Sequence, residues 1–165
     1  MRANARFHSL GFTLIEILVV VLIISAVLGM VTLRLNRDDR DLVRDEADRL
    51  VLLLQTARDE AVLQGALLAL EMGGDGYRFL RPDDKGEFVA ITESPLGPRE
   101  FPPRMDVRLD IEGQLPGKRQ SFVLDPGGTL PAFTVVFTLN EARWWVIGQQ
   151  DGTLRSLPTP DAQTS

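Results

Sequence analysis

The stretch Gly11-Phe12-Thr13-Leu14-Ile15-Glu16, continued by an apolar run to Leu33, decides how this chain is organised. Glu16 is the only charged residue among the 22 residues from Phe12 to Leu33. A helix of that length is about 33 Å long, close to the roughly 30 Å thickness of the hydrocarbon core of a bilayer. We therefore predict a transmembrane helix over residues 12–33, with a separate soluble domain after it.

Composition limits what the soluble domain can be. The whole chain has 165 residues, a formal net charge of −5 and no cysteine. That length is enough for one domain plus the anchor, and without cysteine no disulfide can hold the fold together. Because Arg2 and Arg6 precede the apolar run, the rest of the chain carries 16 basic and 23 acidic residues. A net acidic domain has no overall attraction to nucleic acid, so we expect no nucleic-acid partner.

Charge alone leaves the orientation of the predicted span open. Basic residues near the ends of a span favour the cytoplasmic side. Arg2 and Arg6 lie before the span, but Arg34 and Arg37 follow it and are succeeded by further arginines that alternate with acidic residues. The orientation therefore needs a second argument.

The residues around Gly11 resemble the class III leader of type IV pilins and type II secretion pseudopilins. An ordinary secretory signal has a shorter apolar core and a small residue after it, whereas here Gly11 precedes the run. The resemblance implies that a prepilin peptidase removes the leader, residues 1–11, by cutting after Gly11, and then methylates the new amino terminus at Phe12. It also implies that the N-terminus is cytoplasmic and that the span crosses the inner membrane once, with the head in the periplasm.

Glu16 lies only four residues after Phe12, inside the apolar run. A lone carboxylate within hydrocarbon costs roughly 2.5–3.5 kcal/mol on insertion scales, so such a residue is usually paired or functional. One interpretation is that Glu16 reaches water from its place near the interface. The resemblance implies another, in which Glu16 acts in assembly by pairing with the positive amino terminus of Phe12 in a neighbouring subunit. Methylation of that amine would keep its charge.

Apolar residues after the span recur at steps of four and three, which predicts an amphipathic helix over residues 34–65 that continues from the span. Leu52, Leu53 and Val62 widen the apolar stripe, and Gly65 is a typical stop. Because no proline interrupts residues 34–41, the span and this helix can join in one rod of about 50 residues, roughly 75 Å long. The helix-packing residues expected on its apolar face are Val43, Ala47, Leu50, Leu54, Ala57 and Ala61.

The pattern of residues 66–157 predicts a β-rich head of about eight mostly antiparallel strands, which the resemblance implies lies in the periplasm. Residues 158–165 are expected to form a disordered tail. Gly73-Gly74-Asp75-Gly76 and Asp151-Gly152 are hairpin signals. The expected strands are Ala66–Met72, Tyr77–Arg81, Glu87–Thr92, Met105–Ile111, Ser121–Leu124, Phe133–Leu139, Arg143–Gly148 and Thr153–Leu157.

Two loops and a pair of tryptophans stand out within the head. Residues 92–104 contain four prolines and are expected to have no regular structure, and residues 125–131 form a second loop. Loops of this length are either functional or, on the plainer interpretation, crossovers between two sheets.

Trp144 and Trp145 are adjacent, so they point to opposite sides of their strand. We expect one of them in the core.

The element order, one long helix followed only by strands, resembles the minor pseudopilin H branch, which is shared with the minor type IV pilin T branch. Ala57-Arg58-Asp59-Glu60-Ala61 looks like the end of that branch's helix, although Gln64 stands where the branch usually has a basic residue. Asp125-Pro126-Gly127-Gly128 and Asp151-Gly152 resemble its turns. The resemblance implies an α+β, pilin-like fold, in which a long N-terminal helix, transmembrane then amphipathic, packs on a β-sandwich-like head.

The resemblance also implies partners. They are the other major and minor pseudopilins of the same fibre, the prepilin peptidase and the inner-membrane assembly platform, with the secretin or cargo as further candidates. The favoured function is that of a minor pseudopilin of the type II secretion system, whose periplasmic fibre drives export of folded proteins across the outer membrane.

Two other functions are possible alternatives for a chain of this kind. A minor type IV pilin would act in pilus assembly or DNA uptake. Its DNA-binding version is expected to carry several arginines near the carboxyl end, but the last 20 residues of this chain hold only Arg155.

An enzyme would need an active site. The one histidine, His8, lies in the leader and cysteine is absent, so the head has neither a Ser-His-Asp triad nor a His/Cys zinc site. We expect no enzyme, no cofactor and no metal.

Overall fold

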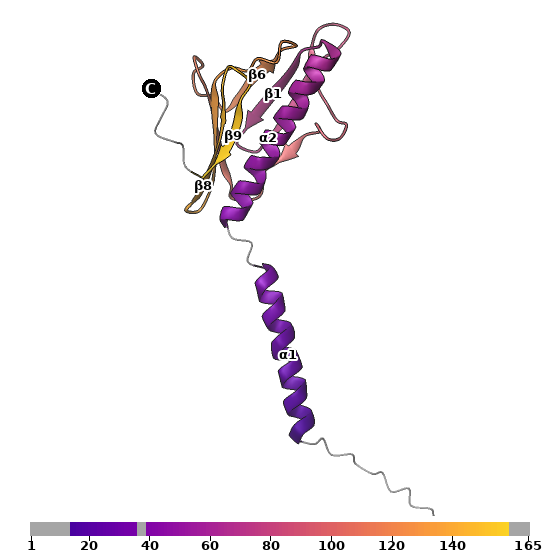
Figure 1. Ribbon diagram of the computed structural model, residues 1–165, viewed down its shortest axis with the longest axis vertical. Helices are drawn as coiled ribbons and strands as arrows, with labels where there is room; N and C mark the ends of the chain where they lie inside the picture. Colours follow the sequence, from indigo (N-terminus) through magenta and orange to yellow (C-terminus); the bar gives the residue numbers. More distant parts are fainter. Residues whose placement is uncertain (1–13, 36–38, 159–165) are drawn as a thin grey trace, which may run out of the picture. The chain divides into compact units, whose positions relative to one another are not determined.

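The computed structural model describes residues 14–35 and 39–158. The chain divides into two compact units, Met1–Arg37 and Asp38–Ser165. Helix α1 belongs to the first unit, and helix α2 opens the second, which we call the head (Figure 1). The predicted single rod depends on residues 36–38, which lie outside the described residues, and it stays a prediction. Most of the predicted tail, residues 159–165, also lies outside them.

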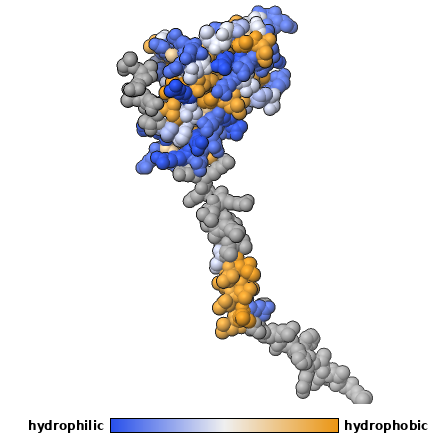
Figure 2. Space-filling view, in the orientation of Figure 1, coloured by the Kyte–Doolittle hydropathy of each residue, from blue (hydrophilic) through white to orange (hydrophobic). Residues whose placement is uncertain are grey.

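Helix α1 spans Leu14–Leu35. Its large apolar side chains from Leu14 to Ile24 are exposed, with exposed fractions between 44% and 84%, and they form an apolar surface in Figure 2. Among the described residues of its own unit, no apolar partner covers this length of the helix. Among the described residues, neither helix of the chain is both long enough and apolar enough to cross a membrane.

Helix α2 spans Asp39–Gln64. Asp39 and Asp41 lie in its first turn, where carboxylates interact favourably with the helix dipole. The helix ends before Gly65, whose φ of 61° is in the left-handed region that glycine adopts without steric cost. The Ala66 amide then donates to the Ala61 carbonyl at 3.1 Å, which closes the last turn.

The described part of the head contains nine strands in two sheets, and the strands pair antiparallel. Sheet A has the order β3-β2-β1-β6, with β4 also paired to β2, and sheet B has the order β5-β7-β8-β9. This arrangement confirms the predicted α+β fold. The strands are β1 Leu68–Gly73, β2 Gly76–Pro82, β3 Phe88–Ala90, β4 Arg99–Glu100, β5 Asp106–Ile111, β6 Arg119–Leu124, β7 Phe133–Leu139, β8 Ala142–Gly148 and β9 Leu154–Leu157.

Strand β4 corrects the expectation that residues 92–104 have no regular structure. Arg99 pairs with Tyr77 and Glu100 pairs with Gly76 at the start of β2. A Cβ atom at Gly76 would overlap the Arg99 carbonyl, so the approach of the two strands requires glycine there. Two residues between prolines still form ladder hydrogen bonds, because Pro98 and Pro102 flank the pair without lying in it.

Both predicted hairpins are present. Gly73 pairs with Gly76 across the β1–β2 turn, which leaves Gly74 and Asp75 as the two loop residues. Between β8 and β9, the Gly152 amide donates to the Gln149 carbonyl at 3.0 Å, and Gly152 has a φ of 81°. The glycines at the loop positions allow the tight reversal that each hairpin needs.

The hydrophobic core lies between α2 and the inner faces of the two sheets. Helix α2 contacts β7, β8 and β9 of sheet B and β1 and β6 of sheet A (Figure 1). Strand β7 alternates strictly, with its first, third, fifth and seventh residues buried, as expected for a strand with one face on the core. Loops 92–104 and 125–131 both carry the chain from sheet A to sheet B, as the plainer of the two interpretations holds.

Candidate assembly surfaces

The leader residues and Glu16 are the first predicted site. Gly11 and Phe12 lie outside the described residues, so cleavage and methylation there stay predictions. Glu16 lies in the first turn of α1 and is exposed. A carboxylate near a helix N-terminus interacts favourably with the helix dipole. Its predicted role in assembly concerns a second subunit and also stays a prediction.

The six predicted helix-packing residues of α2 all lie in one core cluster and have no exposed area. They contact the inner faces of both sheets within the same chain. Any contact that α2 makes with a neighbouring subunit must therefore use its other faces. The six residues are Val43, Ala47, Leu50, Leu54, Ala57 and Ala61.

The opposite side of α2 differs from what the sequence predicted. Leu52 and Val62, expected to widen the buried stripe, are 62% and 49% exposed, and Leu63 is 86% exposed. Leu53 is half-buried and packs against the core. The buried stripe is narrower than expected because the three exposed side chains point away from the two sheets.

A buried ion pair joins α2 to the loop 92–104, and sequence reasoning missed it. Glu46 is 6% exposed, and both of its carboxylate oxygens accept from the Arg99 guanidinium, one of them from Nε at 3.2 Å. The hydrogen bond to Glu46 raises the pKa of Arg99. Glu46 lies three residues after Val43, on the apolar face of α2. A charged residue at such a position was the one sign in the sequence that Glu46 is buried with a partner.

Tyr77 lies beside this ion pair. Its ring packs against Phe79 and Phe101, and its hydroxyl has no hydrogen-bond partner within the described part of the chain. Burial, with a smaller contribution from the Glu46 carboxylate, raises the pKa of Tyr77 to about 12. The ion pair and the aromatic contacts together fasten the loop 92–104 to the core.

The end of α2 around Arg58 and the two glycine turns, Asp125–Gly128 and Asp151–Gly152, lie together in the structure. Arg58, on α2, donates from Nη1 to the Gly152 carbonyl at 2.7 Å. A Cβ atom at Gly152 would lie 3.0 Å from that guanidinium and 3.1 Å from the Gly128 carbonyl. Gly128 and Gly152 both have positive φ, so neither position suits a larger residue. Arg58 thus connects the helix to the β8–β9 turn, beside the loop 125–131.

The first half of α2 is fastened to sheet B by polar contacts. Trp144 Nε1 donates to Ser156 Oγ at 2.7 Å, and that hydroxyl in turn donates to the Asp48 carboxylate. The Arg44 guanidinium lies 5.9 Å from the centroid of the Trp144 ring. Trp144 is therefore the tryptophan on the core side, half-buried rather than enclosed, and Trp145 points to the opposite side of β8.

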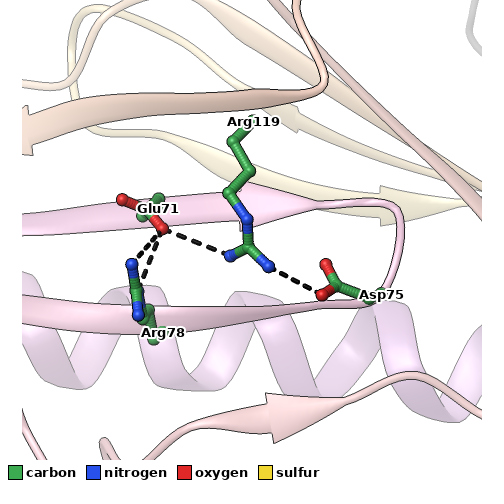
Figure 3. A network of polar contacts seen from close by, with 4 residues as sticks. All are labelled: Glu71, Asp75, Arg78 and Arg119. Atoms are coloured by element: carbon green, nitrogen blue, oxygen red, sulfur yellow. Dashed lines mark hydrogen bonds and ion pairs between the residues drawn. The ribbon is translucent and has the colours of Figure 1, made fainter.

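A charge network lies on the outer face of sheet A, around β1 (Figure 3). The Glu71 carboxylate accepts from Arg78 at 2.7 Å and from Arg119 at 3.2 Å, and Arg119 also donates to Asp75 at 2.6 Å. Two acids and two arginines thus neutralise one another. In the described part of the chain, no group of three or more His, Cys, Asp or Glu side chains is arranged to hold a metal ion.

Comparison with known protein families identifies which family shares this leader and this head. The family described as "Type II transport protein GspH" matches residues 46–152, and the "Prokaryotic N-terminal methylation motif" matches residues 6–32.

The chain belongs to the GspH family.

Two relatives carry the name Type II secretion system protein H. The protein from Aeromonas hydrophila is 28% identical over 176 aligned residues, which cover 95% of this chain and 90% of that protein. The protein from Pseudomonas aeruginosa is 32% identical over 108 residues, covering 64% of this chain and 61% of that protein. The GspH membership makes the chain a minor pseudopilin of the H type, and it favours secretion over the pilus alternative. The family is a structural one and is not known for catalysis.

Solved structures agree on the fold. The minor pseudopilin EpsH from the type II secretion system of Vibrio cholerae superposes with a TM-score of 0.65 at 15% identity, covering 76% of this chain and all of that one. The solution structure of GspH from E. coli gives a TM-score of 0.60 at 16% identity, covering 78% and 98%. The predicted pilin-like architecture is confirmed by these likenesses.

Proposed function

We propose that this GspH-family chain is a membrane-anchored minor pseudopilin that assembles with other pseudopilins into the periplasmic fibre of a type II secretion system. That fibre drives export of folded proteins across the outer membrane. The observation that carries the proposal is the joint match of the head, over residues 46–152, and of the leader motif, over residues 6–32, in one chain.

The anchor is the segment 12–33, which includes residues outside the described part. Its support is the sequence, since 22 residues with one charge match the hydrocarbon thickness. The prepilin peptidase removes residues 1–11 and methylates Phe12. The head then lies in the periplasm, and the assembly platform in the inner membrane adds the subunit to the fibre.

Glu16 supplies the register of assembly in this proposal. Its carboxylate pairs with the methylated, positively charged amine of Phe12 in the neighbouring subunit. Between apolar helices the low dielectric strengthens that attraction well beyond its value in water. An unpaired Glu16 would be unfavourable there, so a subunit is retained only when its helix has moved to the correct axial position.

The secretion function is tested by deleting the gene and measuring three outputs in the same strain: secretion of exported enzymes, twitching motility and DNA uptake. We expect secretion to stop while motility and uptake continue, and the full-length chain supplied in trans should restore secretion. Intact secretion in the deletion strain would refute the proposal. Loss of motility or uptake with intact secretion would favour the pilus alternative.

A further inference from the structure

The outer face of sheet B, which points away from α2, carries an apolar centre. Directly paired residues lie on the same face of a sheet. The register therefore places one row across all four strands, made of Arg108, Val136, Trp145 and Leu157. A second row contains Asp110, Thr134, Ile147 and Arg155, and a third contains Asp106, Thr138 and Arg143.

The core identifies which side of the sheet this is. Phe133, Val135 and Phe137 alternate with the residues of these rows along β7 and belong to the core cluster. The described core cluster contains none of Val136, Trp145, Ile147 and Leu157, which are half-buried. A sheet with one solvated face normally places polar residues outside. Four adjacent large apolar side chains on that side are typical of a contact surface.

Charged side chains surround the apolar centre. Arg143 and Arg155 lie on its β8–β9 side, and Asp106, Arg108 and Asp110 lie along β5. Arg143 and Arg155 are exposed and make no ion pair with any described residue, although Arg155 contributes, after hydrogen bonds from Thr153, to lowering the pKa of Asp151. The Arg108 side chain is 82% exposed and contacts Asp106 at 3.2 Å. Residues 39–158 as a whole contain 20 acidic and 14 basic residues, so two arginines without an ion pair on the β8–β9 side of this face are unlike the head as a whole. On the outer face of sheet A, by contrast, each arginine of the network already has an acidic partner.

A groove of about 560 Å³ continues this face at the β5 edge. Its lining includes the outward-facing Arg108, Asp110, Thr134 and Val136, and Lys118 adds a cation from the segment before β6. The surface therefore combines a tryptophan, several arginines and a concave border. Tryptophan and arginine are the side chains most often found at the energetic centres of protein interfaces.

We propose that this outer face of sheet B is the docking surface for an acidic protein surface on another pseudopilin of the same fibre, with Trp145 as its apolar anchor. The inference rests on the proposed function, because it needs a fibre partner. Arg143 and Arg155 favour an acidic partner on the β8–β9 side of the face, and the apolar centre favours a protein surface that can cover it. Nucleic acid and anionic membranes bind mainly through many cations, and this face has few.

The test uses the full-length chain in secreting cells, with a photo-crosslinking amino acid at Thr138, beside Arg143. The matched control places the same amino acid at Ser121, an exposed position on the outer face of sheet A. We expect Thr138 to cross-link to another pseudopilin, and Ser121 to give at least a tenfold lower yield. Cross-links from Thr138 to lipid, nucleic acid or cargo alone, or equal yields at the two positions, would overturn the proposal.

Charge variants give the second arm. The double variant Arg143→Glu/Arg155→Glu should lower the Thr138 cross-link at least tenfold, whereas Arg143→Lys/Arg155→Lys should retain it. Trp145→Ala should lower it similarly, and the thermal unfolding midpoint of each variant reports whether it folds. Because the charge variants lie on the surface, they decide the matter even where Trp145→Ala lowers stability.

Failure of this inference is distinguishable from failure of the proposed function. If deletion of the gene stops secretion but the Arg143→Glu/Arg155→Glu chain secretes and cross-links like wild type, the docking surface is wrong and the pseudopilin function stands. If deletion leaves secretion intact, the proposed function itself is wrong.

Discussion

Large apolar side chains of α1 from Leu14 to Ile24 are exposed by 44–84%, whereas the six apolar residues on the inner face of α2 have no exposed area. Both helices are rich in leucine and valine, but α2 spaces its buried apolar residues at three and four, whereas α1 has apolar residues on every side. A helix that is apolar on all sides needs partners from outside its own unit. A helix that is apolar on one side can bury that side against the sheets of its own unit. Substitutions in the two helices should therefore have separate effects on head stability and on assembly.

The largest effect on head stability is expected from Leu54→Asp. Leu54 is fully buried in α2, so a carboxylate there loses its hydration without gaining a partner, and we expect a loss of more than about 4 kcal/mol. The measurement is chemical unfolding of the full chain in detergent, followed by the fluorescence of its two tryptophans, both of which lie in the head.

The matched control for Leu54→Asp is Leu52→Asp, two residues away on the exposed side of the same helix, where the side chain is 62% exposed. We expect a change within about 0.5 kcal/mol. Equal losses in the two variants would contradict the assignment of buried and exposed faces.

The second effect concerns the buried ion pair. Glu46→Gln keeps the shape of the side chain but leaves the Arg99 guanidinium without its carboxylate, and we expect a loss of about 2–3 kcal/mol. This is below the value for a fully enclosed pair, because the Arg99 side chain is 37% exposed and water screens it in part. Glu87→Gln, at an exposed position, serves as the control in the same unfolding measurement, and a loss there as large as for Glu46→Gln would show that burial is not the cause.

A smaller effect is expected from Arg58→Ala, which removes the hydrogen bond to the Gly152 carbonyl. We expect about 1–2 kcal/mol, since the donor is charged and only partly buried. Arg58→Lys should recover part of this loss, and Lys85→Ala, an exposed cation, should cost little. Hydrogen exchange of the β8–β9 turn provides the local readout, and unchanged protection there in Arg58→Ala would argue against the contact.

Titration of Tyr77 at alkaline pH tests the burial of its ring and does not change the stability of the head at neutral pH. It is the only tyrosine, and burial raises its pKa from 10.0 to about 12. The neutral phenol is the form that the folded head favours, so the head should lose stability as pH rises from about 10 to 12, where the unfolded chain ionises first. Ultraviolet absorbance of tyrosinate during a pH titration measures this directly. A midpoint near 10 in the folded chain would contradict the burial of this ring.

The smallest effect on the head is expected from Glu16→Val in α1, with no change in unfolding free energy. Its effect should appear in assembly: cleavage after Gly11, measured by mass spectrometry of the amino terminus, continues, but the subunit is absent from the fibre. Ile17→Val, the neighbouring apolar control, should assemble normally. Incorporation of Glu16→Val at the wild-type level would refute the role proposed for this carboxylate.

Sequence periodicity found the inner face of α2 because a helix on a core repeats its apolar residues at three and four, and all six residues from Val43 to Ala61 were located that way. Periodicity overestimated the width of that face, because Leu52 and Val62 are exposed. An apolar side chain in the sequence does not show whether another part of the fold packs against it. Strand β4 was missed because two residues between prolines carry no periodic signal. The Glu46–Arg99 pair was missed because its partners are 53 residues apart along the chain.

The sequence by itself determined the order of elements, the leader motif with Gly11, Phe12 and Glu16, and the glycine turns, because each of these depends on residues that are neighbours along the chain. Only the tertiary structure decided how wide the buried face of α2 is, which carbonyl accepts the hydrogen bond from Arg58, and which side of sheet B carries Trp145 with Arg143 and Arg155 near it. Those features depend on contacts between segments far apart in sequence, and their geometry is fixed only when α2 and the two sheets pack around one core.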